Sequence, residues 1–126
     1  MAALTTYLAN KLLDEICRNT NYVPPAVAYL ALFTSATSDA GGGTEVTGGS
    51  YARQAVTFSA AASKATTNSV AVSFTAMPAA TVTHAALMDA STSGNMLLHG
   101  PLAASKTVGA GDTLTFAIGD VDGSLA

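Results

Sequence analysis

Helical periodicity occurs only once in this sequence, between Leu4 and Cys17. Large apolar side chains recur there at every fourth position, at Leu4, Leu8, Leu12 and Ile16. This spacing is typical of one face of an amphipathic helix. We expect Thr5 or Thr6 to cap its start, and Pro24 to prevent its continuation. Because no second helical period follows, folds that alternate strands with helices are excluded.

The apolar stripe of this helix is consistent with two roles. One is to cover an edge or a face of a sheet. The other is to act as an arm that docks on a neighbouring subunit, with Leu8 and Leu12 as candidate contact residues. Cys17 lies on or beside the stripe, and we expect it to be chemically inert.

After Pro25 the pattern changes to that of β-strands. Residues 26–34 are apolar on both faces, which is typical of a central strand that is covered on both sides. Further strand signals are separated by turn signals at intervals of about 8–15 residues. They occupy residues 51–58, 69–74, 81–88, 96–102 and 113–119.

Alternation within these segments predicts which side chains share a face. The sets are Val70, Val72 and Phe74; Val82, His84, Ala86 and Met88; and Leu114, Phe116 and Ile118. Between the strands, residues 60–68 are expected to form a loose connection, and residues 108–112 a tight turn. Gly100 and Pro101 are expected to end the fourth segment, and residues 120–126 to form a polar tail.

Many short strands with one helix predict a mainly β protein. We expect an antiparallel β-sandwich of jelly-roll-like form with one N-terminal amphipathic helix. The length of 126 residues corresponds to a single domain, residues 1–126. Within it, residues 1–22 form the helix or arm and residues 23–126 the sandwich.

A glycine-rich loop precedes the strand at 51–58 and is the first candidate contact site. Residues 35–50 form a loop of a length that is usually functional or disordered. Gly48 and Gly49 give the backbone access to positive φ, and Tyr51 and Arg53 then point to one side of the strand. We expect this loop, with Glu45, to contact a partner.

Arg53 is one of the few charged residues inside a strand, and two roles are open for it. It is expected either to pair with Glu45 or Asp39 of the preceding loop, or to reach a carboxylate or carbonyl of a neighbouring subunit.

The charge content restricts the classes of partner. Charged residues make up only 10% of the chain and the net charge is −3, so the basic surface that nucleic acids require is missing. No apolar run is long enough for a membrane span, and a signal peptide is not expected. A surface with so few charges is expected to be covered by other subunits.

Chemically reactive residues are few, and no pattern indicates an active site. Cys17, His84 and His99 carry no local catalytic signature, and the two histidines lack a third ligand at metal-binding spacing. We expect His84 to be hydrogen-bonded and partly buried. The sequence therefore predicts no enzyme, no metal and no cofactor.

Several segments, taken together, resemble one family. They are Tyr-Leu-Ala-Asn-Lys-Leu-Leu-Asp (7–14), Leu-Ala-Leu-Phe-Thr (30–34), Gly-Gly-Ser-Tyr-Ala-Arg (48–53), Thr-Val-Thr-His-Ala-Ala-Leu-Met-Asp-Ala (81–90), Gly-Asn-Met-Leu-Leu-His-Gly-Pro-Leu (94–102) and Ser-Lys-Thr-Val-Gly-Ala-Gly-Asp-Thr (105–113). The set resembles small virion proteins of tailed bacteriophages that are often called tail-fibre proteins. It is also similar, in size and strand pattern, to proteins that coat or cement phage capsids. The resemblance implies a structural role without catalytic residues.

These observations predict a bacteriophage virion protein that is made in the cytoplasm of the host. We expect a capsid decoration or cement protein, which binds as a dimer or trimer across subunits of the major capsid protein. The alternative is a component of the tail fibre, baseplate or neck. A sugar-binding module is less favoured, because the chain has no tryptophan and only four tyrosines.

Overall fold

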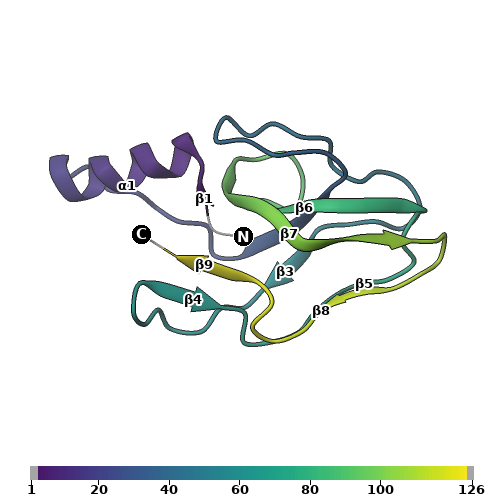
Figure 1. Cartoon of the computed structure of the whole chain (residues 1–126). Coiled ribbons are helices and arrows are strands. Elements are labelled where there is room, and N and C mark those ends of the chain that lie inside the picture. Colours follow the sequence, from purple (N-terminus) through teal and green to yellow (C-terminus); the bar gives the residue numbers. More distant parts are fainter. Residues whose placement is uncertain (1–2, 125–126) are drawn as a thin grey trace.

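A computed structural model describes residues 3–124 of the chain (Figure 1). These residues contain one helix, α1 (Thr6–Arg18), and nine strands. The strands are β1 (Ala3–Leu4), β2 (Ala28–Phe33), β3 (Gln54–Val56), β4 (Ala65–Thr67), β5 (Val72–Phe74), β6 (Ala80–Met88), β7 (Met96–Val108), β8 (Leu114–Phe116) and β9 (Asp122–Ser124). Residues 1, 2, 125 and 126, which the expected arm and tail include, lie outside the described part.

The strands form one large sheet and two small ones. The large sheet has the order β1-β7-β6-β2-β3, and the small sheets pair β4 with β9 and β5 with β8. All these pairings are antiparallel. The predicted class, mainly β with antiparallel sheets and one N-terminal helix, is therefore confirmed. The jelly-roll connectivity stays a prediction.

The main core lies between the large sheet and the small sheets. It joins Leu30 and Leu32 of β2 to Phe74 of β5 and Phe116 of β8, all at most 6% exposed. The rings of Phe74 and Phe116 meet edge to face with centroids 6.1 Å apart, a favourable aromatic geometry. The described strands therefore pack as two layers.

Strand β2 is covered on both faces, as predicted. Leu30 and Leu32 belong to the main core, whereas Ala31 and Phe33 belong to a smaller buried cluster on the other face. This central place explains the continuous apolar run, because both sets of alternating side chains avoid water.

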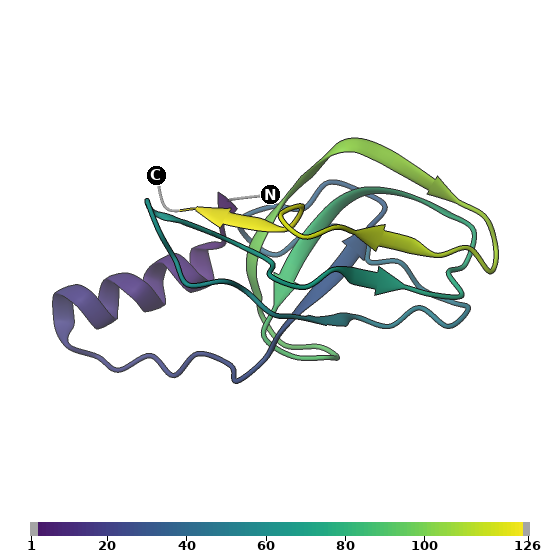
Figure 2. The ribbon, with the colours of Figure 1, turned by 90° about the horizontal axis from the view of Figure 1, so that it is seen from below.

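The helix begins later than its periodicity indicates. Ala3 and Leu4 pair with β7 as β1, so Leu4 is not helical and the predicted start was wrong. Thr5 caps the helix and accepts a hydrogen bond from the amide of Leu8, as one of the two expected caps. Asn19 ends the helix in the left-handed conformation, which asparagine tolerates well. In both views α1 extends away from the strands at the end where β4 and β9 lie (Figures 1 and 2).

Strand β7 does not end at Gly100 and Pro101, so this prediction was wrong. It continues to Val108 along β6, and residues 102–105 stand opposite the single residue Thr83. A bulge of this kind accommodates a proline, which cannot donate to a regular ladder. The tight turn after β7 is confirmed, because the amide of Asp112 bonds to the carbonyl of Gly109 at 3.1 Å.

The register shift between β6 and β7 also changes the face to which the side chains of β6 point. Val82 belongs to the main core, but Ala86 and Met88 belong to the smaller cluster. The prediction that Val82, His84, Ala86 and Met88 share one face was therefore wrong, because a register shift separates Val82 from His84. His84 is partly buried and its Nδ1 bonds to Thr83 at 2.9 Å, as expected.

Besides β1, two short strands were not predicted. Residues 65–67 form β4 inside the expected loose connection, and its partner β9 lies in the expected polar tail. Val121, which precedes β9, is only 2% exposed, so the description of a polar tail was wrong. Val70 and Ile118 are 57% and 67% exposed instead of inward, because β5 begins after Val70 and β8 ends before Ile118.

Candidate interaction surfaces

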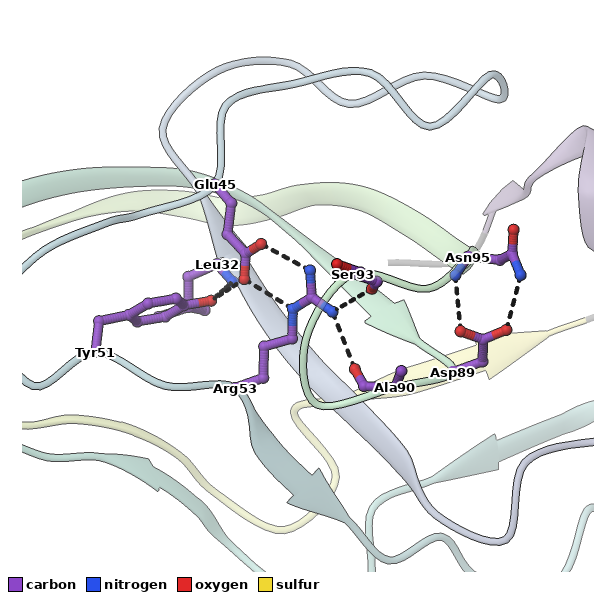
Figure 3. Close-up of polar contacts among 8 residues, drawn as sticks. All are labelled: Leu32, Glu45, Tyr51, Arg53, Asp89, Ala90, Ser93 and Asn95. Atoms are coloured by element: carbon purple, nitrogen blue, oxygen red, sulfur yellow. Dashed lines mark hydrogen bonds and ion pairs between the residues drawn. The ribbon is translucent and has the colours of Figure 1, made fainter.

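Arg53 forms a bidentate ion pair within its own loop and hydrogen bonds to a second loop (Figure 3). Its Nε and Nη2 donate to the two carboxylate oxygens of Glu45 at 2.9 and 2.8 Å. Its Nη1 donates to the carbonyls of Ala90 and Ser93 at 2.9 and 2.7 Å. The side chain is only 9% exposed. The loop before β3 is thereby fixed to the turn between β6 and β7.

Tyr51 extends this arrangement into the core. Its hydroxyl donates to Glu45 Oε2 at 2.7 Å and accepts from the amide of Leu32 at 3.0 Å. Its ring stacks on Phe74 with centroids 6.0 Å apart. We call Glu45, Tyr51 and Arg53 the Glu45 cluster. It ties the loop both to β2 and to the main core.

The electrostatics of the Glu45 cluster follow from its burial and its hydrogen bonds. Burial acts to raise the pKa of Glu45, but the hydrogen bonds from Arg53 and Tyr51 outweigh it, so the pKa is lowered. The hydrogen bond to Glu45 raises the pKa of Arg53. Burial raises the pKa of Tyr51. Glu45 is therefore held ionised and Tyr51 protonated at neutral pH.

Of the two roles expected of Arg53, the ion pair within the chain is present in the structure. The structure contains the predicted pair with Glu45, whereas Asp39, the other suggested partner, bonds to His99. Four of the five N–H donors of an arginine are used within the chain at this site. Contact of Arg53, Tyr51 or Glu45 with another subunit stays a prediction.

Gly48 lines a hollow beside the Glu45 cluster, and Gly49 follows it in the chain. Both have positive φ, 98° and 55°, and a Cβ on Gly49 would come within 3.2 Å of the backbone nitrogen of Pro78. The hollow measures about 370 Å³ and is also lined by Glu45, Tyr51 and Ser93. Of the two predicted contact glycines, Gly48 therefore shares the hollow with Glu45 and Tyr51, whereas Gly49 lies against Pro78.

A second set of hydrogen bonds, which we call the His99 clamp, also holds the loop between β2 and β3 and was not predicted. His99 of β7 is 8% exposed, and its Nδ1 and Nε2 lie 2.8 Å from Thr37 Oγ1 and from Asp39 Oδ1. The carbonyl of Asp39 also accepts a hydrogen bond from the amide of Thr6 at 2.9 Å. His99 therefore fixes the loop to β7, next to the start of α1.

Nothing in the described residues brings the reactive side chains into a metal site. Between residues 3 and 124 there is no group of three His, Cys, Asp or Glu side chains suited to a metal ion. Cys17 is exposed on α1, whereas His99 is enclosed by Thr37 and Asp39.

Helix α1 is attached to the sheet mainly through Thr5. The Thr5 amide donates to the carbonyl of Leu97 at 3.0 Å, and its hydroxyl donates to the carbonyl of Met96 at 2.6 Å. None of the described residues of α1 itself is buried. The helix therefore does not cover a face of the sheet, and it buries its apolar side only in part, at Leu8 and Leu12.

The apolar stripe of α1 consists of Leu8, Leu12, Leu13 and Ile16. Leu8 and Leu12 line an apolar groove of about 250 Å³ together with Leu98 and Ala65. Leu13 and Ile16 are 58% and 78% exposed. The predicted contact residues Leu8 and Leu12 thus lie in a groove, and docking of a neighbour there stays a prediction.

Comparison with known proteins identifies the family. The family described as podophage GP4 fiber I protein gp80 matches this chain over residues 3–124. No curated protein matches the chain. In the part that the structure describes, no helix has the length and apolarity required to span a membrane. The chain therefore belongs to the podophage GP4 fiber I protein gp80 family, and it is a structural protein of a bacteriophage virion.

Proposed function

We propose that this protein is a non-enzymatic structural subunit of a phage tail fibre. The observation that carries the proposal is the arrangement of α1, which projects from the sandwich (Figure 1) with Leu13 and Ile16 of its apolar stripe exposed. Neighbouring exposed leucine and isoleucine side chains are typical of a surface that meets another protein. The description of the family as a fiber protein supports the position in a fibre.

The rest of the molecule is suited to a rigid attachment module. The long loop between β2 and β3 is held by Arg53 on one side and by His99 on the other. Because such a loop is already ordered, little conformational entropy is lost when it contacts a partner. The sandwich can therefore keep the arm and the loop in a fixed relative position during assembly.

A place on the capsid is the competing proposal. A decoration protein that binds the major capsid protein would use the same arm and loop, so the fold supports both positions. The family description favours the fibre over the capsid.

The number of copies in the virion separates the two positions. Quantitative mass spectrometry of purified virions is expected to give a small multiple of the rotational symmetry of the tail. Immunogold labelling is expected at the tail. A copy number in proportion to the major capsid protein, with label over the whole head, would reject the fibre and support decoration.

Virions that lack the protein give an independent test. We expect them to lose adsorption to the host while the heads keep their resistance to heat. Heads that become heat-sensitive with normal adsorption would contradict the fibre position. Complementation with the wild-type protein is the control in both cases.

A further inference from the structure

A cavity of about 310 Å³ lies between the two layers of the sandwich. Residues 101–104 of β7 form one side of it, and residues 120–122, which lead into β9, form the other. Ala85 and Phe116 also line the cavity, and both belong to the main core, so they give it an apolar floor. Concave sites with apolar linings are the usual form of small-molecule sites, and this volume is at the lower end of their range.

The bulge in β7 forms one wall of this cavity. Residues 102–105 stand opposite the single residue Thr83 of β6, and bulges are frequent beside functional sites, where they redirect side chains. Leu102 packs partly against the main core, whereas Ala103 and Ala104 are exposed. The wall is therefore apolar, and its small side chains leave the cavity accessible.

Lys106 brings a positive charge to the cavity. It pairs in register with Val82 of β6, and residues directly opposite each other on neighbouring strands share a face. Because Val82 is fully buried, the side chain of Lys106 leaves β7 on the core side, where it lines the cavity. Within residues 3–124, its ammonium group takes part in no hydrogen bond or ion pair. Its donors are therefore free to bind a ligand.

Asp120 lines the same cavity from the opposite wall. Its Oδ2 accepts a hydrogen bond from the amide of Ala117 at 3.0 Å, and its Oδ1 has no partner in the part of the chain that the structure describes. Asp122 adds a second carboxylate to this wall. Lys106 and Asp120 thus line one cavity without pairing with each other, so a ligand can bridge them.

A group that bridges Lys106 and Asp120 must accept a hydrogen bond from the first and donate one to the second. A hydroxyl group does both, whereas an anion is repelled by Asp120 and an amine by Lys106. A ligand with neighbouring hydroxyl groups on an apolar ring satisfies both residues and covers the floor. Saccharides combine these features.

We propose that this cavity is a saccharide-binding site, in which Lys106 and Asp120 bind neighbouring hydroxyl groups of one sugar ring. Leu102 and the floor of Ala85 and Phe116 contact the C–H groups of the ring. The lack of tryptophan does not exclude this site, because side chains of the core take the place of an exposed aromatic ring. The inference rests on the cavity and not on the place of the protein in the virion.

NMR spectroscopy of the full-length protein with ¹³C-labelled alanine methyl groups tests the proposal. The methyl groups of Ala85, Ala103 and Ala104 report on the cavity, and those of Ala61 and Ala65, in the groove beside α1, are the internal control. The probes are D-glucose, D-galactose, L-rhamnose and N-acetyl-D-glucosamine, each titrated separately. We expect at least one sugar to shift the cavity signals, with saturation at millimolar concentration, as is usual for so few ligand atoms. The control signals should not move.

The variant Lys106→Met keeps an unbranched apolar stem but removes the donors, and it should bind the sugar about tenfold more weakly. The matched control is Lys64→Met, since Lys64 is also exposed but lines the groove beside α1; it should bind as the wild type does. Asp120→Asn keeps an oxygen for the amide of Ala117 but turns a donating NH₂ group to the ligand, so it should weaken binding several-fold. Circular dichroism of all three variants should show an unchanged fold, because these side chains are exposed.

Three results would overturn the saccharide site. They are the absence of shifts with all four sugars, equal shifts of the control signals, and an equal loss of binding in Lys64→Met. Shifts with N-acetylglycinamide alone would assign the cavity to a peptide of a partner protein. Polysaccharide extracted from the host surface separates two sources of the ligand, since a polymer ligand saturates at a lower concentration of sugar units than the free sugar. Failure here would leave the fibre position open, because virion copy number measures that position separately.

Discussion

The buried side-chain amide of Asn68 donates a hydrogen bond to the carbonyl of Ala117, 3.1 Å away, and so joins the residues after β4 to those after β8. The same amide group donates to Val70, and its oxygen accepts from the amides of Gly119 and Val121 at 2.9 and 3.0 Å. All four hydrogen-bonding positions of the Asn68 side chain are thus used. Asn68 holds the two small sheets in place.

Replacing Asn68 by alanine is expected to lower the free energy of unfolding by about 2–4 kcal/mol, because it leaves several backbone groups without partners. Urea denaturation measures the change. The control is Ser73→Ala, which removes only an exposed hydrogen bond to Thr115 and should cost less than about 1 kcal/mol. Equal effects of the two substitutions would show that Asn68 does not hold the two small sheets together.

The role of Asn68 explains why part of the fold is not visible in the sequence. The helix is long enough for its own periodicity to indicate it, and β2 and β6 are long enough to be recognised as strand segments. Strands β4 and β9 have three residues each, and they form because distant segments pair and because Asn68 fixes the neighbouring turn. Neither sequence, Ala-Thr-Thr nor Asp-Gly-Ser, has the alternating large apolar residues that indicated β5 and β8.

The contact surfaces likewise include contacts that the local sequence predicts and contacts that only the fold creates. The pair of Glu45 and Arg53 was predictable because the two residues are eight positions apart, at the end of one loop. The clamp of His99 was not predictable, because Thr37 and Asp39 lie 62 and 60 positions away and meet it only through the fold. The apolar stripe was predictable from helical spacing, but its exposure depends on where α1 leaves the sheet.

Replacing Arg53 by lysine is expected to lower the free energy of unfolding by about 2 kcal/mol, because lysine keeps the charge but loses the bidentate pair and one carbonyl contact. Thermal denaturation measures it. Arg18→Lys is the matched control, since the side chain of Arg18 is 72% exposed and its pair should contribute less than about 1 kcal/mol.

Virion occupancy of the Arg53→Lys protein then separates folding from attachment. A lower melting temperature with normal occupancy would assign Arg53 to the fold. Normal melting with reduced occupancy would support the predicted contact with a partner.

The Glu45 cluster predicts a dependence of stability on pH. The folded-state pKa of Glu45 is lowered from its ordinary value of 4.5, so its contribution is complete above that value and is lost as the pH falls through the folded-state pKa. The difference in unfolding free energy between the wild type and Glu45→Gln should therefore shrink in acid. Glu15→Gln, the same change at an exposed residue of α1, is the control. A difference that is constant from neutral to acid pH would contradict the prediction.

Thr5 anchors the start of α1 to β7, and its substitution tests this attachment. Thr5→Ala removes the cap on Leu8 and the hydrogen bond to the carbonyl of Met96, and we expect a loss of about 1–2 kcal/mol. The loss of stability should be greatest in α1. Hydrogen exchange of the α1 amides should therefore accelerate more than that of the β2 amides. Thr6→Ala is the control, because Thr6 is exposed and does not cap the helix. Uniform acceleration over both elements would mean that Thr5 stabilises the whole sandwich and does not act as the anchor of the arm.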